Sequence, residues 1–245
     1  MTAIVIIPAR YQSARFPGKP LYPLKGKPVV QYVYENAKSA SLARDVIVAT
    51  DSETILEKVF EFGGRAVMTD SGHPSGTDRI AEVALSLECD IIVNVQADEP
   101  LIRPEMIDAV ISLLDDSRAS MGTLAKIIER KHEITDPNVV KVVFDSEGFA
   151  LYFSRSQIPF LAPHSELKSD YRCFKHIGIY SYRRDALIAF TRLRPSYLEK
   201  MEKLEQLRAL ENGMKIKVGE TYHETYGVDT PQDLERVEEW LNTSL

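Results

Sequence analysis

The stretch TAIVIIPA, residues 2–9, is a continuous run of mostly β-branched apolar residues with no alternation of polar and apolar positions. RDVIVATD, residues 44–51, and CDIIVNVQAD, residues 89–98, have the same character. Such runs are typical of strands that are buried on both faces of a parallel sheet. Before and after the third run, apolar residues recur at helical spacing in 79–88 and 103–114. This alternation predicts an α/β fold with a doubly wound, mostly parallel sheet, whose ligands bind beyond the carboxyl ends of the strands.

The second half of the chain has a different pattern. Three strand-like runs follow one another without a strong helix between them: VVKVVFD (139–145), FALYFSRS (149–156) and FKHIGIYSY (174–182). They predict an antiparallel insertion subdomain around residues 139–185. No internal repeat or clean linker is visible, so residues 1–245 are expected to form a single domain that includes this subdomain.

The remaining elements are predicted from caps and periodicity. Helices are expected over 184–193 and 197–212, the second ending at Gly213. A strand at 215–220 and a last helix that begins at Thr230–Pro231 complete the chain. The residues RRD at 183–185 are interpreted as a solvated turn that enters the first of these helices.

Composition and charge limit the classes of function. The formal net charge is −6, which disfavours a nucleic-acid partner bound through general phosphate attraction. The N-terminal apolar run has no basic segment before it and is too short to span a bilayer, so no membrane span is expected. Cys89 and Cys173 are interpreted as reduced, buried thiols. We therefore expect a cytoplasmic protein.

The first strand ends in a loop with three cations. In IIPARYQSARFPGKPL, residues 6–21, these are Arg10, Arg15 and Lys19, with Ser13 between them. The loop has neither the G-x-G-x-x-G pattern of dinucleotide sites nor the G-K-[ST] of a P-loop. Arginine forks and a lysine point charge suit a triphosphate, whereas a solvated surface turn is the alternative.

Carboxylates are expected at the same edge of the sheet. The third buried run leads to Asp98, and a carboxylate opposite phosphate-binding cations suggests Mg²⁺. Asp229 in YGVDTP is a second candidate ligand, unless it caps the last helix. Glu99 is interpreted as a surface residue and Asp51 as a helix N-cap. PSGTDR, residues 74–79, could bind a base or phosphate or merely start a helix.

Several motifs together resemble a known family. They are P-A-R-x-x-S-x-R-x-P-x-K-P-L from residue 8, then ATD, SGTDR, VNVQADEP, ALYFSR, KHIGIY, LEQLR and GVDTP. Over nearly the whole chain they are similar to the 3-deoxy-manno-octulosonate cytidylyltransferase (CMP-KDO synthetase) family. The resemblance implies a nucleotide-diphospho-sugar transferase-like, Rossmann-like fold. One departure is Ala97, where the family usually has glycine; the extra methyl group removes no functional group.

The resemblance also implies a reaction and a set of site residues. The reaction converts CTP and KDO to CMP-KDO and pyrophosphate for lipopolysaccharide, with Mg²⁺ as cofactor and a homodimer as the assembly. Carried over by motif, the catalytic residues are Arg10, Lys19, Asp98 and Asp229, of which Asp98 and Asp229 hold the metal. The nucleotide side comprises Arg10, Ser13, Arg15, Lys19, Ser75, Arg79 and Gln96. The sugar side comprises Gln96, Arg155, His176, Tyr180, Glu205 and Gln206.

Some assignments stay open at the level of sequence. His176 alone in an apolar strand is also typical of a buried structural residue. Glu205 must face a pocket or pair with Arg208. The sugar carboxylate needs a cation, for which Arg155 and Lys141 are candidates. Rival functions are activation of 8-amino-KDO or a sialic acid, and nucleotide binding without catalysis.

Overall fold

The computed structural model describes residues 1–12, 16–162 and 171–243. Its main sheet has the strand order β11-β7-β10-β6-β1-β4-β5. Four neighbouring strands run parallel: β1 (Ala3–Ala9), β4 (Ala43–Thr50), β5 (Ala66–Met68) and β6 (Ile91–Asn94). β10 (Phe174–Arg183) is antiparallel to β6 and to β7 (Met121–Ile127), and β11 (Ile216–Glu220) is parallel to β7. The predicted mostly parallel sheet is confirmed.

Helices cover both faces of this sheet. Alternate residues of β1 face opposite sides: Val5 and Ile7 belong to one core cluster, and Ile4 and Ile6 to the other. The first cluster includes residues of α1 (Val29–Lys38), α2 (Glu53–Glu61) and α4 (Pro104–Ser112). The second includes residues of α3 (Gly76–Leu85), α6 (Arg184–Thr191) and α8 (Gln206–Glu211). The central strand β1 is therefore apolar throughout because both of its faces are buried.

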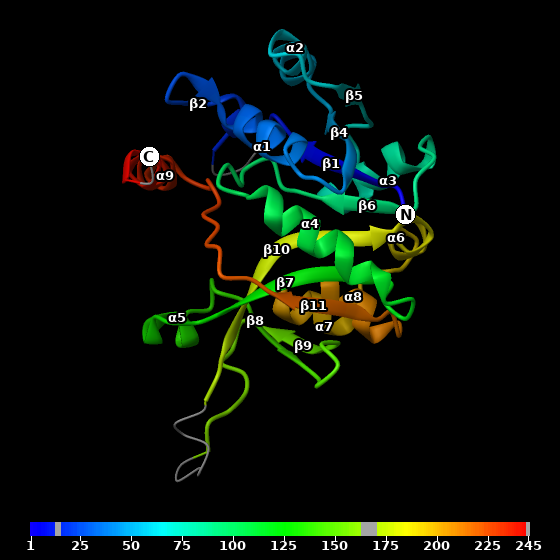
Figure 1. Ribbon diagram of the computed structural model, residues 1–245, viewed down its shortest axis with the longest axis vertical. Coiled ribbons are helices and arrows are strands. Elements are labelled where there is room, and N and C mark those ends of the chain that lie inside the picture. The colour runs from blue at the N-terminus through cyan, green and yellow to red at the C-terminus, as the bar shows by residue number, and fades with distance from the viewer. Residues whose placement is uncertain (13–15, 163–170, 244–245) are drawn as a thin grey trace.

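Short elements and the C-terminal helix complete the molecule. They are η1 (Lys19–Leu21), the hairpin of β2 (Pro23–Leu24) and β3 (Lys27–Pro28), η2 (Leu113–Asp115) and α5 (Lys131–Thr135). The last helix, α9 (Pro231–Thr243), lies beside the β2 hairpin (Figure 1) and packs its Leu234 and Val237 with Leu24 and Val29. Among the described residues, no helix is long and apolar enough to cross a membrane.

The antiparallel strands of the second half are also observed. β8 (Lys141–Phe144) pairs antiparallel with β9 (Ala150–Ser154) and with the start of β10. This unit projects from the end of the molecule opposite α2 and β5 (Figure 1). The later part of β10 runs through the main sheet between β6 and β7, so the insertion and the central sheet share one long strand.

The single helix predicted over 197–212 is wrong. The chain forms α7 (Tyr197–Glu202) and α8, separated by Lys203, whose φ of 56° is left-handed. The break places Leu204 and Leu207 in the core together. The predicted end of this segment is confirmed, because Gly213 follows the cap of α8 with a φ of 74°.

The segment predicted at 183–185 as a solvated turn enters a helix as expected, since α6 begins at Arg184 and Asp185 is exposed, but the solvation predicted for Arg183 is wrong. Arg183 is the last residue of β10, and its guanidinium donates to the backbone carbonyls of Leu114 at 2.7 Å and Ala119 at 2.8 Å. These carbonyls belong to the α4–β7 connection, a partner that the local sequence does not reveal.

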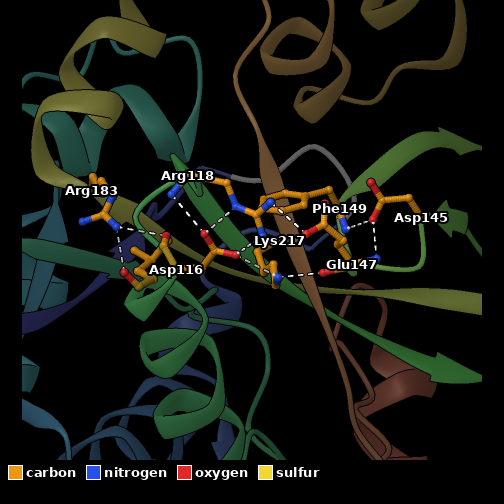
Figure 2. Close-up of polar contacts among 8 residues, drawn as sticks. Asp116, Arg118, Asp145, Glu147, Phe149, Arg183 and Lys217 are labelled. Carbon is orange, nitrogen blue, oxygen red and sulfur yellow. Dashed lines mark hydrogen bonds and ion pairs between the residues drawn. The ribbon is translucent and has the colours of Figure 1, made fainter.

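The same region protects the edge strand β11. Figure 2 shows Asp116 accepting from Arg118, at 2.9 and 3.0 Å, and from Lys217 at 3.1 Å. These hydrogen bonds, Arg118 first and then Lys217, hold the pKa of Asp116 well below its usual range. Both cations lie over the ring of Phe149, at 4.9 and 4.4 Å from its centroid. Since Phe149 also bridges to Lys217 through the backbone, the β8–β9 turn covers the edge of the sheet.

Candidate active site

The candidate site lies at the carboxyl edge of the parallel strands. Ala9 pairs with Thr50 at the ends of β1 and β4, so Arg10 and Asp51 leave the sheet at the same level. Two cavities open here, of about 610 and 270 Å³, and Arg10 and Gln12 line both. The larger contains Asp51, and the smaller contains Lys19, Gln96 and Asp98. The structure thus brings these residues together at the edge that the sheet topology predicts. Ser13 and Arg15 lie outside the described residues.

Lys19 is held between two carboxylates. Gly18, with a left-handed φ of 72°, turns the chain into η1, which begins at Lys19. The ammonium group pairs with Asp98 and, at 3.1 Å, with Asp229. Burial lowers the pKa of Lys19, but the two carboxylates outweigh it and leave the pKa raised, so the side chain is charged. Lys19 therefore contacts the expected metal ligands in this structure.

Asp229 is not the cap of the last helix. Thr230 Oγ1 accepts from the backbone N–H of Asp233 at 3.3 Å, and Asp233 accepts in return from the backbone N–H of Thr230 at 2.9 Å. This reciprocal arrangement leaves the carboxylate of Asp229 facing Lys19. The backbone N–H of Val228 donates to the carbonyl of Asp98 at 2.8 Å, which ties the two segments together.

The surface interpretation of Glu99 is wrong. Its carboxyl group is buried, and burial, with the charges of Asp98 and Asp229, raises its pKa to about 8. Glu99 Oε2 is buried without a hydrogen-bond partner among the described residues. A Cβ at Gly227 would lie 3.3 Å from Glu99 Oε1, so the segment leading to Asp229 passes close against this carboxyl group. The sequence gives no sign of this, because the contact joins residues more than a hundred positions apart.

The donor set at this site fits a hard cation. Asp98 and Asp229 place carboxylate oxygens around one ammonium group, and the neighbouring Glu99 has a buried oxygen without a hydrogen-bond partner among the described residues. Mg²⁺ prefers such ligands and usually keeps several waters or substrate phosphate oxygens. In the described part of the chain, no group of three or more Asp, Glu, His or Cys side chains forms a complete metal cage. An ion at Asp98 and Asp229 would therefore draw its other ligands from substrate and water.

Arg79 does not lie in either cavity. Its side chain projects from α3 and is fully buried, and the guanidinium donates to Asp51 at 2.7 Å and to Thr69. Arg79 is therefore not placed for the direct nucleotide contact that was expected. It holds the carboxylate of Asp51 in position instead. The N-cap interpretation of Asp51 is wrong, because Ser52 is the N-cap of α2. Ser75 is the N-cap of α3 and accepts from the backbone N–H of Asp78 at 3.1 Å.

A third, small cavity of about 70 Å³ gathers most of the expected sugar-side residues. Glu205 accepts from Thr77 at 2.6 Å and lies 3.8 Å from Arg208, so it both faces the cavity and pairs with the arginine. Burial raises the pKa of Glu205. The polar residues of the lining are Thr77, Asn94, Gln96, Tyr180, Tyr182, Glu205 and Gln206.

His176 lies beside this cavity on β10. Its Nε2 is 3.0 Å from Thr123 Oγ1, and its ring packs edge-on against Phe153 and beside Tyr180. Burial lowers the pKa of His176 to about 3. The imidazole is therefore neutral at physiological pH, and it can exchange a hydrogen bond but supplies no positive charge.

The two cations considered for a sugar carboxylate are engaged by backbone. Lys141 is fully buried and donates to the carbonyls of Val139 and Arg155, each at 2.6 Å, and of Asp136 at 2.8 Å. Burial lowers its pKa. Because the side chain of Lys141 has no exposed surface, the suggestion that Lys141 binds substrate is wrong. Arg155 donates to the carbonyls of Glu202 at 2.8 Å and Pro137 at 2.9 Å, and it is not among the lining of the small cavity.

A doubly wound sheet with cations and carboxylates at its carboxyl edge is the architecture of a nucleotide-dependent transferase. The family model described as cytidylyltransferase matches residues 4–216, and this chain belongs to that family, among the 3-deoxy-manno-octulosonate cytidylyltransferases.

Two curated relatives and one solved structure support this membership. The 3-deoxy-manno-octulosonate cytidylyltransferase of Geotalea uraniireducens is 56% identical over 98% of this chain and 99% of its own. The enzyme of the same name from Thermodesulfovibrio yellowstonii is 53% identical over 99% of each. The solved structure of a CMP:2-keto-3-deoxy-manno-octonic acid synthetase complexed with CTP is 43% identical, covers 100% of both chains and has a TM-score of 0.93.

Proposed function

We propose that this protein transfers CMP from CTP to 3-deoxy-D-manno-octulosonate, forming CMP-KDO and pyrophosphate. The observation that carries the proposal is the juxtaposition of Lys19 with Asp98 and Asp229, beside a cavity that is lined by Lys19, Asp98 and Arg10. Cations for a triphosphate and oxygens for a divalent ion lie together, as nucleotidyl transfer requires. The names of the relatives supply the two substrates.

The chemistry follows from this arrangement. The anomeric hydroxyl of the sugar attacks the α-phosphorus in line, loses its proton, and forms a new O–P bond as the bond to pyrophosphate breaks. Mg²⁺ bound at Asp98 and Asp229 would neutralise phosphate charge and lower the pKa of the attacking hydroxyl. Arg10 and Lys19, with Ser13 and Arg15 from the same loop, hold the phosphates and stabilise the charge that develops on pyrophosphate.

The small cavity marks the sugar side. Gln96 lines both this cavity and the one that contains Lys19, so a sugar here would lie next to the triphosphate. Tyr180, Glu205 and Gln206 offer polar groups for its hydroxyls, and His176 offers a neutral ring nitrogen. Arg155 stays our candidate for the sugar carboxylate, which would replace its backbone acceptors on binding.

The nucleotide side includes residues with indirect roles. Ser75 begins α3 beside the cavity that contains Gly76, so it can orient the N-terminal turn of that helix toward the nucleotide. Arg79 would act through Asp51, which lines the larger cavity.

The assembly and location are part of the proposal. We infer a homodimer in the cytoplasm, where CTP is available, with the 139–185 unit contributing to sugar binding and to the dimer interface. Light scattering coupled to size-exclusion chromatography tests the dimer, and a mass of 27.7 kDa would exclude it.

Release of pyrophosphate tests the reaction. The purified protein with CTP, KDO and Mg²⁺ should release pyrophosphate and form CMP-KDO in equal amounts. Omission of the sugar should abolish release. A protein that binds CTP but releases no pyrophosphate with any acidic sugar would be a nucleotide-binding protein without catalysis, which is the alternative class.

A further inference from the structure

Lys19 has two sets of partners that it cannot hold at once. Its ammonium group lies between Asp98 and Asp229, and its side chain is only 15% exposed. In the proposed reaction the same ammonium group stabilises the triphosphate, and the same two carboxylates hold a divalent ion. The ammonium group must therefore leave Asp98 and Asp229 before it can bind the triphosphate and before these carboxylates can bind the ion.

The competition is electrostatic. A divalent cation that binds the two carboxylate oxygens would lie within a few ångströms of the ammonium group. Like charges at such a separation repel each other, and more strongly at a partly buried site than in bulk water, because the effective dielectric constant there is lower. The metal and the Lys19 ammonium therefore exclude each other from this position.

We propose that Lys19 is an internal counter-ion that occupies the metal position in the free protein, and that the divalent ion displaces its ammonium group onto the phosphates of the nucleotide. The inference rests on the proposed function, because it requires a divalent ion and a triphosphate as ligands. It adds a property of this chain: metal and nucleotide bind cooperatively, and Lys19 transmits the coupling.

The surroundings of Lys19 confine the movement to its side chain. Gly18 N–H donates to the carbonyl of Tyr11 at 2.7 Å, Leu21 N–H to Gly18 at 2.9 Å, and Tyr22 N–H to Lys19 at 3.1 Å. The backbone is thus held by its own turn. The side chain adjoins the cavity of about 270 Å³ that contains Arg10, which gives the ammonium group a place to go.

The carboxyl groups around Lys19 also favour its role as a counter-ion, because they bring several negative charges close together. Next to Asp98 lies Glu99, whose Oε2 is buried without a hydrogen-bond partner among the described residues, and a Cβ at Gly227, two residues before Asp229, would lie 3.3 Å from Glu99 Oε1. The ammonium of Lys19 offsets this concentration of negative charge. When a triphosphate arrives with its own negative charge, the ammonium is attracted away and the two carboxylates become available to the metal.

Binding of Mn²⁺, measured by the loss of its free electron paramagnetic resonance signal, tests the proposal without relying on turnover. Lys19→Met removes the ammonium and keeps most of the side-chain length. In the absence of nucleotide we expect it to bind Mn²⁺ about 10-fold more tightly than the wild type, in the lower part of the usual range of coupling between two ligands. A non-hydrolysable α,β-methylene analogue of CTP should tighten Mn²⁺ binding in the wild type far more than in Lys19→Met.

Two further variants make the outcomes distinct. Lys27→Met is the matched control, because Lys27 forms an exposed ion pair with Glu35 at 2.9 Å, and its Mn²⁺ affinity should equal that of the wild type. Asp98→Asn tests the metal site itself and should weaken Mn²⁺ binding.

If Asp98→Asn binds Mn²⁺ normally, the metal site and the proposed mechanism fail. If Asp98→Asn weakens binding but Lys19→Met does not tighten it, or Lys27→Met tightens it equally, only the counter-ion proposal fails. Lys19→Gln provides the same test if the Met variant does not fold.

Discussion

At the scale of single residues, Asp98 is the side chain on which the proposed chemistry depends most. It is partly buried, contacts Lys19, and its backbone carbonyl receives the N–H of Val228. Asp98→Asn should lower kcat/KM by at least about 1,000-fold, since the charge stabilisation by a hard ion is worth several kcal/mol. Pyrophosphate release measures this, and circular dichroism checks the fold. Asp185→Asn, on a 97% exposed side chain, is the control and should keep full activity. An active Asp98→Asn would contradict the assignment.

Lys19 should affect turnover more than nucleotide affinity. The charge on the departing pyrophosphate is largest in the transition state, so Lys19→Ala should lower kcat with a smaller change in the Michaelis constant for CTP. The same variant would bind metal more tightly without nucleotide, so tighter metal binding and slower catalysis should occur together. Steady-state kinetics at saturating Mg²⁺ measure the split. If the variant changed the Michaelis constant alone, the loop would bind CTP equally well in the ground state and the transition state and would not stabilise the departing pyrophosphate.

His176 should make the stability of the protein depend on pH. Because burial lowers its pKa to about 3, the folded state keeps the ring neutral while the unfolded state takes up a proton below its usual pKa of about 6.5. Stability should therefore be lost as the pH falls from about 6.5 toward 3, by about 2 kcal/mol between pH 7 and pH 5. Urea unfolding at the two pH values measures this against His176→Gln. Equal losses in the two proteins would show that His176 does not contribute.

At the scale of elements, the sequence predicts what is local and misses what depends on distant partners. The apolar runs around Val5 and Val93 identify the buried strands because both faces of each strand need apolar residues. The burial of Glu99 depends on the segment that precedes Asp229. The buried position of Arg79, on α3, depends on Asp51, which directly follows β4. Such contacts leave no periodic pattern along the chain. The sequence therefore predicts the edge of the sheet at which the site lies, but not which side chains pair with one another there.

The turn that protects β11 should contribute to stability and not to catalysis. Phe149 is 7% exposed and lies under Arg118 and Lys217 at the start of β11, away from the carboxyl edge that holds the site. Phe149→Leu should lower the free energy of unfolding by about 1–2 kcal/mol through lost packing and lost cation–π contacts. Denaturant unfolding measures it, and kcat should stay unchanged. Phe60→Leu, on a 55% exposed side chain, is the matched control and should change neither quantity.

At the scale of the whole molecule, a single edge of one sheet combines the three cavities. Gln96, at the end of β6, lines both the cavity with Lys19 and the one with Glu205. Strand β10 runs antiparallel to β6, so the residues before Tyr180 extend past the end of that strand and bring His176 to the sugar side. Under the proposed function, the antiparallel strand β10 therefore contributes the sugar side of the site.

This arrangement leads to a prediction about the choice of sugar. The small cavity offers buried polar groups from Tyr180, Glu205 and Gln206, and such groups reject ligands that leave them unpaired. The N-acetyl group and ninth carbon of N-acetylneuraminate should not fit beside them, so we expect CMP transfer to KDO and no appreciable transfer to the sialic acid, with CTP preferred over UTP. An 8-amino-KDO could place its ammonium near Glu205. Competition of the three sugars in one assay decides between them: preference for N-acetylneuraminate would overturn the proposed function, whereas preference for the amino sugar would change only the substrate.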